Sequence, residues 1–189
     1  MKLSEALANR RAVRDFLPDA VSQAVLQELI EAAVQAPSYM NLQPWSFAVV
    51  RERARVADLA AQARRHLLVS MTHQSPFFVQ RDELAAPGFE MFYGAPALIV
   101  VCATQPGAHA DSACAMAAFS LMLTAEASGL GSCWVSQAMP WFESAEGRAA
   151  LKLAPEQRAV APVILGAPAA APLSPGRFKP RITWIGETR

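Results

Sequence analysis

Charged residues are scarce in this chain of 189 residues: they make up 17% of it, against 53% hydrophobic residues. This balance excludes the low-hydrophobicity, high-charge composition of a disordered chain. The length is close to that of one domain, and a compact chain of this mass is expected to expose about 8,800 Å². We therefore expect a single domain over residues 1–189 with a substantial core. A subunit interface is one place for the apolar excess.

Cysteine and histidine are also rare, with three of each. The cysteines show no CxxC pair, and the histidines show no HExxH spacing and no matching carboxylate cluster. The residues concerned are Cys102, Cys114, Cys133, His66, His73 and His109. We therefore expect neither a disulfide framework nor a bound metal, and we expect the cysteines to act as small core residues.

Long hydrophobic runs are missing as well. The uncharged stretch between Asp111 and Glu126 is too short for the roughly 20 apolar residues of a membrane-spanning helix. The N-terminus has no apolar run of signal-peptide length and carries arginines instead. We expect a buried core helix at 111–128, no membrane partner and a cytoplasmic location.

Three well-known catalytic and nucleotide-binding motifs are absent. The sequence contains no GxGxxG after a strand, no GxxxxGK[ST] and no GxSxG, which removes the main support for a dinucleotide-binding Rossmann fold, a P-loop or a nucleophile elbow. The sequence also offers no obvious acid/base pair of carboxylates. A chain without a catalytic side-chain set suits a cofactor that carries the chemistry itself.

What charge there is gathers at the two ends. The net charge of +1 argues against a general nucleic-acid binder. Residues 1–14 hold four basic side chains and one acidic one, and residues 176–189 repeat this ratio, so each end carries +3. Guanidinium groups match phosphate oxygens in pairs, so the two ends are candidates to converge on one compact anion. Two unrelated solvated patches are the alternative that charge alone leaves open.

Hydrophobic periodicity and turn residues predict alternating helices and strands. The expected helices span 4–9, 22–36, 54–68, 111–128 and 146–152. The expected strands span 45–50, 97–103, 132–136 and 159–167. In the last strand, Pro162 argues for an edge position or a bulge. Residues 70–93 look irregular, and four prolines within 167–180 favour an extended tail. The mixture indicates an α+β or mixed α/β layer structure.

Four sequence blocks resemble the nitroreductase family of FMN-dependent oxidoreductases. They are NRRAVRDF near the start, APSYMNLQPWSFAVV after the second helix, GLGSCW after the long helix, and RFKP in the tail. The resemblance implies an α+β, three-layer α/β/α sandwich with a central, mostly antiparallel sheet. It further implies an obligate, domain-swapped homodimer with FMN at the subunit interface and the tail of 166–189 packed on the partner subunit.

The resemblance also assigns cationic residues to the cofactor. Arg10 and Arg11 match positions that contact the FMN phosphate and ribityl chain, and Arg14 matches one that reaches the pyrimidine edge. Arg177 and Lys179 match the basic tail positions that complete the phosphate site. Both positive ends of the chain would then meet one anion.

Two further blocks match segments that cover the flavin ring. The loop supplied by the partner subunit corresponds to Pro37, Ser38, Tyr39 and Asn41. The strand over the inner face of the flavin corresponds to Trp134, Val135 and Ser136. The resemblance implies that the backbone amide near Ser136 points at N5. Gln43, Pro44 and Trp45 are expected to fix the loop.

The chain departs from the family pattern at several positions. Ala12 replaces the usual serine, which removes one hydroxyl contact to the cofactor, worth roughly 1 kcal/mol. The polar residues that many members place at the pyrimidine edge align near Gly88 and Met91, which cannot replace those contacts. Residues 70–93 are the candidate lid over the substrate pocket.

The implied function is a two-electron, ping-pong oxidoreductase. NAD(P)H, as NADH or NADPH, would pass hydride through flavin N5 to an electron-poor acceptor such as a nitroaromatic or a quinone. No side chain is assigned as catalytic, and Arg14 would tune the flavin electrostatically. Two alternatives remain open: divergent flavin chemistry, such as reductive dehalogenation or cleavage of FMN, and a non-catalytic FMN-binding protein.

Overall fold

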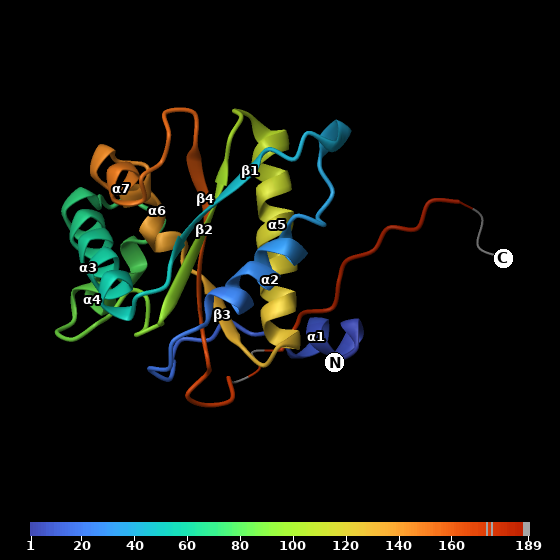
Figure 1. Cartoon of the computed structure of the whole chain (residues 1–189), viewed down its shortest axis with the longest axis horizontal. Coiled ribbons are helices and arrows are strands. Elements are labelled where there is room, and N and C mark those ends of the chain that lie inside the picture. Colours follow the sequence, from blue (N-terminus) through green and yellow to red (C-terminus); the bar gives the residue numbers. More distant parts are fainter. Residues whose placement is uncertain (173, 175, 187–189) are drawn as a thin grey trace.

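A four-stranded antiparallel sheet forms the middle layer of the molecule, with helices on both faces (Figure 1). The computed structural model describes residues 1–172, 174 and 176–186. The strands are β1 (Trp45–Val50), β2 (Ala97–Ala103), β3 (Gly131–Trp134) and β4 (Arg158–Gly166), in the spatial order β1-β2-β4-β3. The expected α+β, three-layer sandwich is therefore confirmed.

Helices of unequal length cover the two faces. One face carries α2 (Gln23–Ala33) and α5 (Ala108–Ala127), while the other carries α3 (Arg53–Ser70), α4 (Arg81–Ala85), α6 (Met139–Phe142) and α7 (Ala145–Ala150) (Figure 1). Helix α1 (Leu3–Asn9) lies against α5. Three single 3₁₀ turns, η1 (Tyr39–Asn41), η2 (Phe78–Gln80) and η3 (Ser136–Ala138), complete the described elements.

The two central strands are buried on both sides, as their apolar runs predict. Along β2, Leu98, Val100 and Cys102 enter the core under α3, while Ile99 and Val101 enter the core under α5. This is the period of two that sends alternate side chains to opposite faces. The sheet therefore has one hydrophobic core on each face.

The prediction for Pro162 is half wrong. Strand β4 lies between β2 and β3, so Pro162 is in a central strand and not at an edge. The register slips two residues away, because Val101 faces Ala161 while the next residue of β2 faces Ala159, which leaves Val160 as the extra residue of a bulge. Pro162 itself stays in register opposite Val100. The Pro162 carbonyl still accepts a hydrogen bond from the Val135 N–H at 2.9 Å.

Several predictions about helices also differ from the structure. The long helix begins at Ala108, so Asp111 lies in its first turn, where it pairs with Arg158 of β4. The first helix begins at Leu3, with Lys2 and not Ser4 at its N-cap. The segment 70–93, expected to be irregular, contains η2 and α4. Short elements such as these depend on tertiary contacts more than on local pattern.

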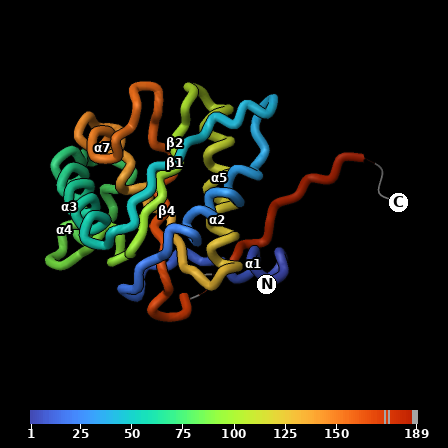
Figure 2. The backbone as a smooth tube through the Cα atoms, viewed as in Figure 1, coloured from blue at the N-terminus to red at the C-terminus, as the bar shows by residue number. Residues whose placement is uncertain are grey.

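The described residues of the tail from 176 onward leave the body of the protein. Figures 1 and 2 show the tail running away from the end of the molecule where α1 and the C-terminal end of α5 lie. Its large apolar side chains are exposed, among them Phe178, Ile182, Trp184 and Ile185. The expectation that the tail is extended is confirmed for its described residues. Within this chain Trp184, 84% exposed, is not a core anchor.

Candidate functional site

The segment after α1 runs beside β3 and joins two of the blocks that carry the family resemblance. Ala12 forms a parallel bridge with Ser132, and the Val13 N–H donates to the Ser132 carbonyl at 3.0 Å. Gly131 permits this approach, because a Cβ built there would lie 2.7 Å from a Val13 methyl group. The arginine-rich block and the GLGSCW block therefore form one structural unit, and Ala12 faces the strand through its backbone.

The start of the tail pairs with the same segment. Phe16 and Pro168 form an antiparallel bridge, the Leu17 N–H donates to the Ala167 carbonyl at 2.9 Å, and the Ala169 N–H donates to the Asp15 carbonyl at 3.0 Å. The segment after the N-terminal arginines and the start of the basic tail therefore lie side by side. The charged residues of the two ends lie farther apart.

Arg11 is held by its own chain. Its guanidinium donates to the Ala8 and Arg10 carbonyls at 2.7 and 2.8 Å and to the Ser174 hydroxyl at 2.8 Å. The Nε atom is buried and has no hydrogen-bond partner among the described residues. Arg11 lines a hollow of about 430 Å³ together with Glu126, Gly131 and tail residues. An orphaned cationic N–H beside such a hollow is a donor available for an anion.

The other cations assigned to the phosphate are less confined. Arg10 is half-buried, whereas Arg177 and Lys179 are exposed on the tail. In the described part of the chain, the Arg177 guanidinium bonds only to the Gly176 carbonyl, at 2.8 Å. Ser174 ties the tail to Arg11 three residues before Arg177, a span of about 10 Å for extended chain. The structure brings Arg11 and the tail together and leaves Arg177 and Lys179 in solvent.

Arg14 borders a separate polar pocket of about 200 Å³. The pocket is lined by Arg14, Gln80, Glu83, Leu84, Phe89, Tyr93 and Gln137. The Arg14 guanidinium carbon lies 6.0 Å from the centre of the Tyr93 ring. Burial raises the pKa of the Tyr93 hydroxyl, and the Arg14 charge acts against that rise. The hydroxyl is therefore protonated near neutral pH, and Arg14 is a positive charge at the mouth of this pocket.

The end of β3 leads into the same region. Val135 is buried, and its N–H donates to the Pro162 carbonyl. Ser136, by contrast, is exposed at the first position of η3. The first N–H groups of a helical turn have no partner inside the turn. Across the residues that the structure covers, the Ser136 N–H has no acceptor. Trp134 is half-buried against the core under α5.

The loop of Pro37, Ser38, Tyr39 and Asn41 lies elsewhere. Tyr39 stacks on His109 at the beginning of α5, with ring centres 4.7 Å apart. Arg11 lines a hollow with Glu126 and Gly131 at the other end of this helix, where Figure 1 shows α1. A helix of 20 residues is about 30 Å long. Within one chain this loop therefore does not join the arginines.

The loop is nevertheless tightly built. Ser38 accepts from the Gln43 N–H at 3.0 Å, and the Gln43 amide donates to Asn41 at 3.2 Å. Met40, Asn41 and Gln43 adopt positive φ angles of 47°, 56° and 46°, which cost energy in residues other than glycine. The expectation that Gln43 fixes the loop is confirmed. Pro44 also contributes, since its carbonyl accepts from Thr104 at 3.0 Å.

The cysteines contribute no reactive group. All three are buried and unpaired. Burial raises the pKa of Cys102 to about 12 and that of Cys114 to about 11. No group of His, Cys, Asp or Glu side chains among the described residues is arranged to hold a metal ion. Nor does any described helix combine the length and apolar character needed to cross a membrane.

Sequence reasoning missed three residues of the pocket beside Arg14: Gln80, Tyr93 and Gln137. Gln137 directly follows the GLGSCWVS stretch, so its position next to Ser136 could have marked it as a candidate site residue. Gln80 lies in the segment of 70–93, where no periodicity predicts which side chains face inward. Only the fold brings it beside Gln137.

The model of the Nitroreductase family matches residues 7–167. The chain belongs to the nitroreductase family. A putative NADH dehydrogenase/NAD(P)H nitroreductase of Methanothermobacter thermautotrophicus is 27% identical over 186 residues, covering 95% of this chain and 84% of the relative. The NADH dehydrogenase of Thermus thermophilus is 36% identical over 93 residues, and this match spans 45% of each chain.

A solved nitroreductase has the same fold. The crystal structure of a nitroreductase with bound FMN from Bacteroides fragilis superposes with a TM-score of 0.82 at 26% identity, covering 99% of this chain and 100% of that one. The alignment therefore spans nearly the whole of both chains.

Proposed function

We propose that this nitroreductase is an FMN-dependent oxidoreductase that takes hydride from NAD(P)H and delivers it to an electron-poor acceptor. The observation that carries the proposal is the bridge between residues 12–13 and β3. It ties the segment that leads to the Arg14 cation to the strand that leads to the free Ser136 N–H, so both belong to one small structural unit. The family membership and the FMN-bound relative support the same assignment.

The residues present fit FMN. Arg11 offers an unpaired buried Nε at a hollow of about 430 Å³, and Arg10 stands next to it in sequence. Phosphate oxygens favour such guanidinium donors. We assign the FMN phosphate to Arg10 and Arg11, with Arg177 and Lys179 completing the site once the tail is folded against it.

The chain's own groups perform binding and electrostatic work. When bound, FMN supplies a two-electron carrier that accepts hydride at N5 and passes it on. Arg14 places positive charge where electron density grows on reduction, and such fixed charges lower the cost of that change. The Ser136 N–H is a free donor for a ring nitrogen. The Tyr93 hydroxyl, kept neutral by burial, is a donor that adds no charge.

We further propose that the site is completed by a second copy of the chain. The loop of Pro37, Ser38, Tyr39 and Asn41 lies about a helix length from Arg11 within one protomer, yet it is rigidly built and exposed. A partner subunit would bring its own loop to the ring. Tyr39 and Met40 are 56% and 78% exposed, as expected for side chains awaiting a contact.

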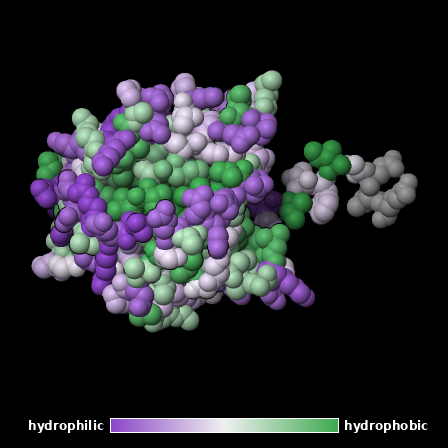
Figure 3. Space-filling view, in the orientation of Figure 1, coloured by the Kyte–Doolittle hydropathy of each residue, from purple (hydrophilic) through white to green (hydrophobic). Residues whose placement is uncertain are grey.

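The surface supports this assembly. The chain exposes 11389 Å², which is roughly 2,600 Å² more than scaling predicts for a compact monomer of its mass. A hydrophobic area bordered by hydrophilic residues lies over the region of β1, an edge strand with Val49 exposed (Figure 3). An exposed apolar edge strand is a surface for pairing. The partner's tail, with its exposed apolar side chains, is the segment we assign to it.

The visible spectrum of the purified protein tests the cofactor. We expect bound flavin, released as FMN on denaturation and identified by chromatography. A colourless protein that ignores added FMN would overturn the proposal.

Steady-state assays then test the reaction. We expect oxidation of NADH or NADPH with a nitroaromatic or a quinone as acceptor, with the parallel double-reciprocal lines of a ping-pong mechanism. Product analysis of the bound flavin distinguishes flavin cleavage, an iodinated or brominated phenol as substrate distinguishes reductive dehalogenation, and failure with every acceptor indicates a non-catalytic flavin-binding protein.

A further inference from the structure

Two glutamines from distant parts of the chain meet at the pocket beside Arg14. The Gln137 side-chain amide donates to the Gln80 side-chain oxygen at 3.2 Å, across 57 positions of sequence. Both side chains line the pocket together with Arg14 and Tyr93. A bond between two neutral side chains stabilises a fold only slightly, so its place beside the pocket is the more informative feature.

Most of the bonding capacity of this pair is unused. A glutamine amide carries two donor hydrogens and an oxygen acceptor. Among the described residues, Gln80 keeps both donor hydrogens, and Gln137 keeps one donor hydrogen and its oxygen, since the bond between them is the only one that either side chain makes. Together with the Arg14 guanidinium, the pocket lining therefore offers several donors and an acceptor.

The pair is held in place from both sides. Gln137 follows β3 within η3. Gln80 precedes α4, and Arg64 of α3 clamps that helix by donating to the Leu84 and Ala86 carbonyls at 2.6 and 2.9 Å. These anchors order the pocket wall before any ligand binds.

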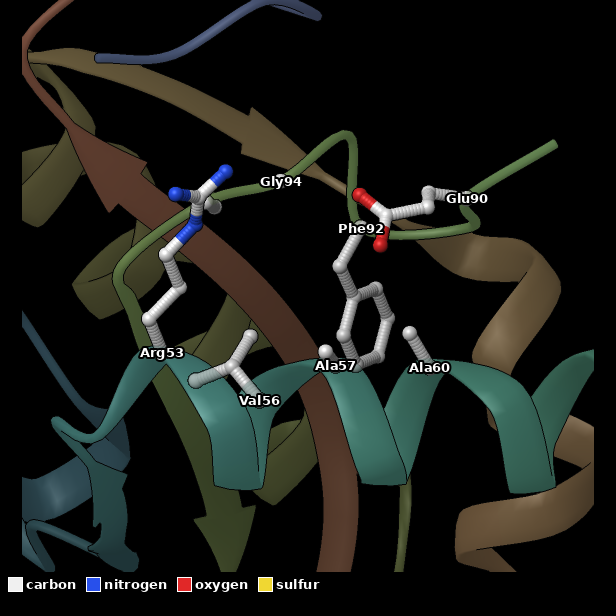
Figure 4. A pocket seen from close by; sticks show the side chains of 8 residues that line it. Arg53, Val56, Ala57, Ala60, Glu90, Phe92 and Gly94 are labelled. Atoms are coloured by element: carbon white, nitrogen blue, oxygen red, sulfur yellow. The ribbon is translucent and has the colours of Figure 1, made fainter. Parts of the chain in front are cut away.

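The next stretch of the candidate lid rests on α3 as well. Figure 4 shows Phe92 lying over this helix between Arg53 and Glu90, around a cavity of about 20 Å³ that is too small for a ligand. Phe92 is buried. The segment of 78–93 is therefore a fixed wall and not a loose cover.

The charges that line the pocket restrict which ligands it can bind. Arg14 contributes a cation and Glu83 a carboxylate, so the lining is balanced and does not select an anion. A set of donors with an acceptor instead suits a planar imide, which offers an oxygen, an N–H and an oxygen in a row. The pyrimidine edge of an isoalloxazine ring carries this arrangement.

We infer that Gln80 and Gln137, together with Arg14, bind the imide edge of the flavin. This inference rests on the proposed function. It accounts for the departure at Gly88 and Met91: the contacts that those positions lack are supplied by one glutamine from the wall of 78–93 and one from the turn after β3. Gln80 and Gln137 position the cofactor and fix its preference for a free N3–H; neither takes part in hydride transfer.

Binding of two flavins to the apoprotein tests the inference. FMN and 3-methyl-FMN, which replaces the N3–H by a methyl group, are titrated by flavin fluorescence quenching. We expect wild type to bind FMN at least tenfold more tightly. We expect Gln137→Leu to reduce that ratio below threefold, because it removes the oxygen that accepts from N3–H. We expect Gln80→Leu to weaken FMN and 3-methyl-FMN by a similar factor, because its donors face ring carbonyls that both flavins carry. Gln27→Leu, on the exposed face of α2, is the matched control and keeps the wild-type ratio.

The outcomes separate this inference from the proposed function. If wild type binds FMN but does not discriminate, or if Gln137→Leu keeps the tenfold ratio, the glutamines do not read the imide edge and the inference is wrong while the cofactor assignment stands. If wild type binds neither flavin, the proposed function itself fails. Urea unfolding midpoints within experimental error of wild type show that a changed ratio does not reflect misfolding.

Discussion

Arg14 stands out among the single residues, because it is the only cation lining the pocket that also holds Gln80 and Gln137 among the described side chains. The Arg14 guanidinium carbon lies 6.0 Å from the centre of the Tyr93 ring. A cation at that place favours the reduced, more electron-rich form of a bound flavin ring. The charge of Arg14 and not its hydrogen-bonding shape alone is therefore expected to matter for redox behaviour.

The first prediction concerns this charge. Arg14→Ala is expected to lower the reduction potential of the bound flavin and to slow its reduction by NAD(P)H at least tenfold, whereas Arg14→Lys retains most of the potential because it retains the charge. Anaerobic dye-equilibration titration and stopped-flow absorbance measure the two quantities. Arg65→Ala on the exposed face of α3 is the control. An unchanged potential in Arg14→Ala would refute this role.

The second prediction concerns Gly131. Adding a Cβ there places it 2.7 to 2.9 Å from Val13 side-chain carbons, a clash that must push the segment 12–13 away from β3. We expect Gly131→Ala to cost about 1–3 kcal/mol of unfolding free energy and to weaken FMN binding, because Arg10, Arg11 and Arg14 move with that segment.

Chemical denaturation and flavin titration check this prediction. Val13→Ala in the same chain is expected to restore part of both losses by making room for the new methyl group. A double-mutant cycle with no coupling between the two positions would contradict the steric explanation.

At the scale of elements, helix α7 depends on a local cap. Helix α7 begins after Ser144, whose hydroxyl accepts from the Gly147 N–H at 3.1 Å and donates to the Trp141 carbonyl at 2.7 Å. One side chain thus fixes both the start of α7 and the end of α6. The Gly147 position tolerates no side chain, since a Cβ would lie 2.0 Å from the Trp141 carbonyl.

The third prediction follows from this cap. Ser144→Ala is expected to lower the unfolding free energy by about 1 kcal/mol, measured as a lower Tm or urea midpoint. Ser128→Ala, at the C-cap of α5, removes an exposed hydroxyl that makes no side-chain bond among the described residues, so its effect is expected within ±0.5 kcal/mol. Equal effects at both sites would show that the cap bonds carry no stability.

The elements also show how far local pattern reaches. Strand β2 and helix α5 were predictable because a continuous apolar run and a long uncharged stretch have few other solutions. Residues 70–93 were not predictable: α4 depends on the Arg64 clamp from α3, a contact between residues 20 or more positions apart. Pro162 suited a bulge or an edge equally, and only the strand order decided between them.

For the whole molecule, the unpaired surfaces are the main feature. Strand β1 pairs only with β2 within the described part of the chain, and the tail beyond residue 176 carries large exposed apolar side chains. A second copy of the chain would account for both features, because it would cover the edge of β1 and supply the loop of 37–41.

The fourth prediction is therefore the oligomeric state. Light scattering after size exclusion is expected to give twice the chain mass of 20.3 kDa. Combining Ile182→Asp with Trp184→Asp is expected to shift the protein toward monomer and to lower FMN affinity together with it, because the proposed site is built from both copies. Val69→Asp, on an exposed position of α3, is the control. A wild-type protein that is monomeric and still binds FMN would contradict the proposed assembly of two copies.

The sequence by itself determined the family, the layers and the cationic set, because apolar periodicity is local and the four blocks keep their residue types wherever the chain folds. Tertiary structure alone decided that Ala12 and Ser132 share a bridge, that Gln80 meets Gln137, and that the loop of Tyr39 lies a helix length from Arg11. These contacts join positions separated by dozens of residues, and their partners are selected by packing geometry, which no local pattern encodes.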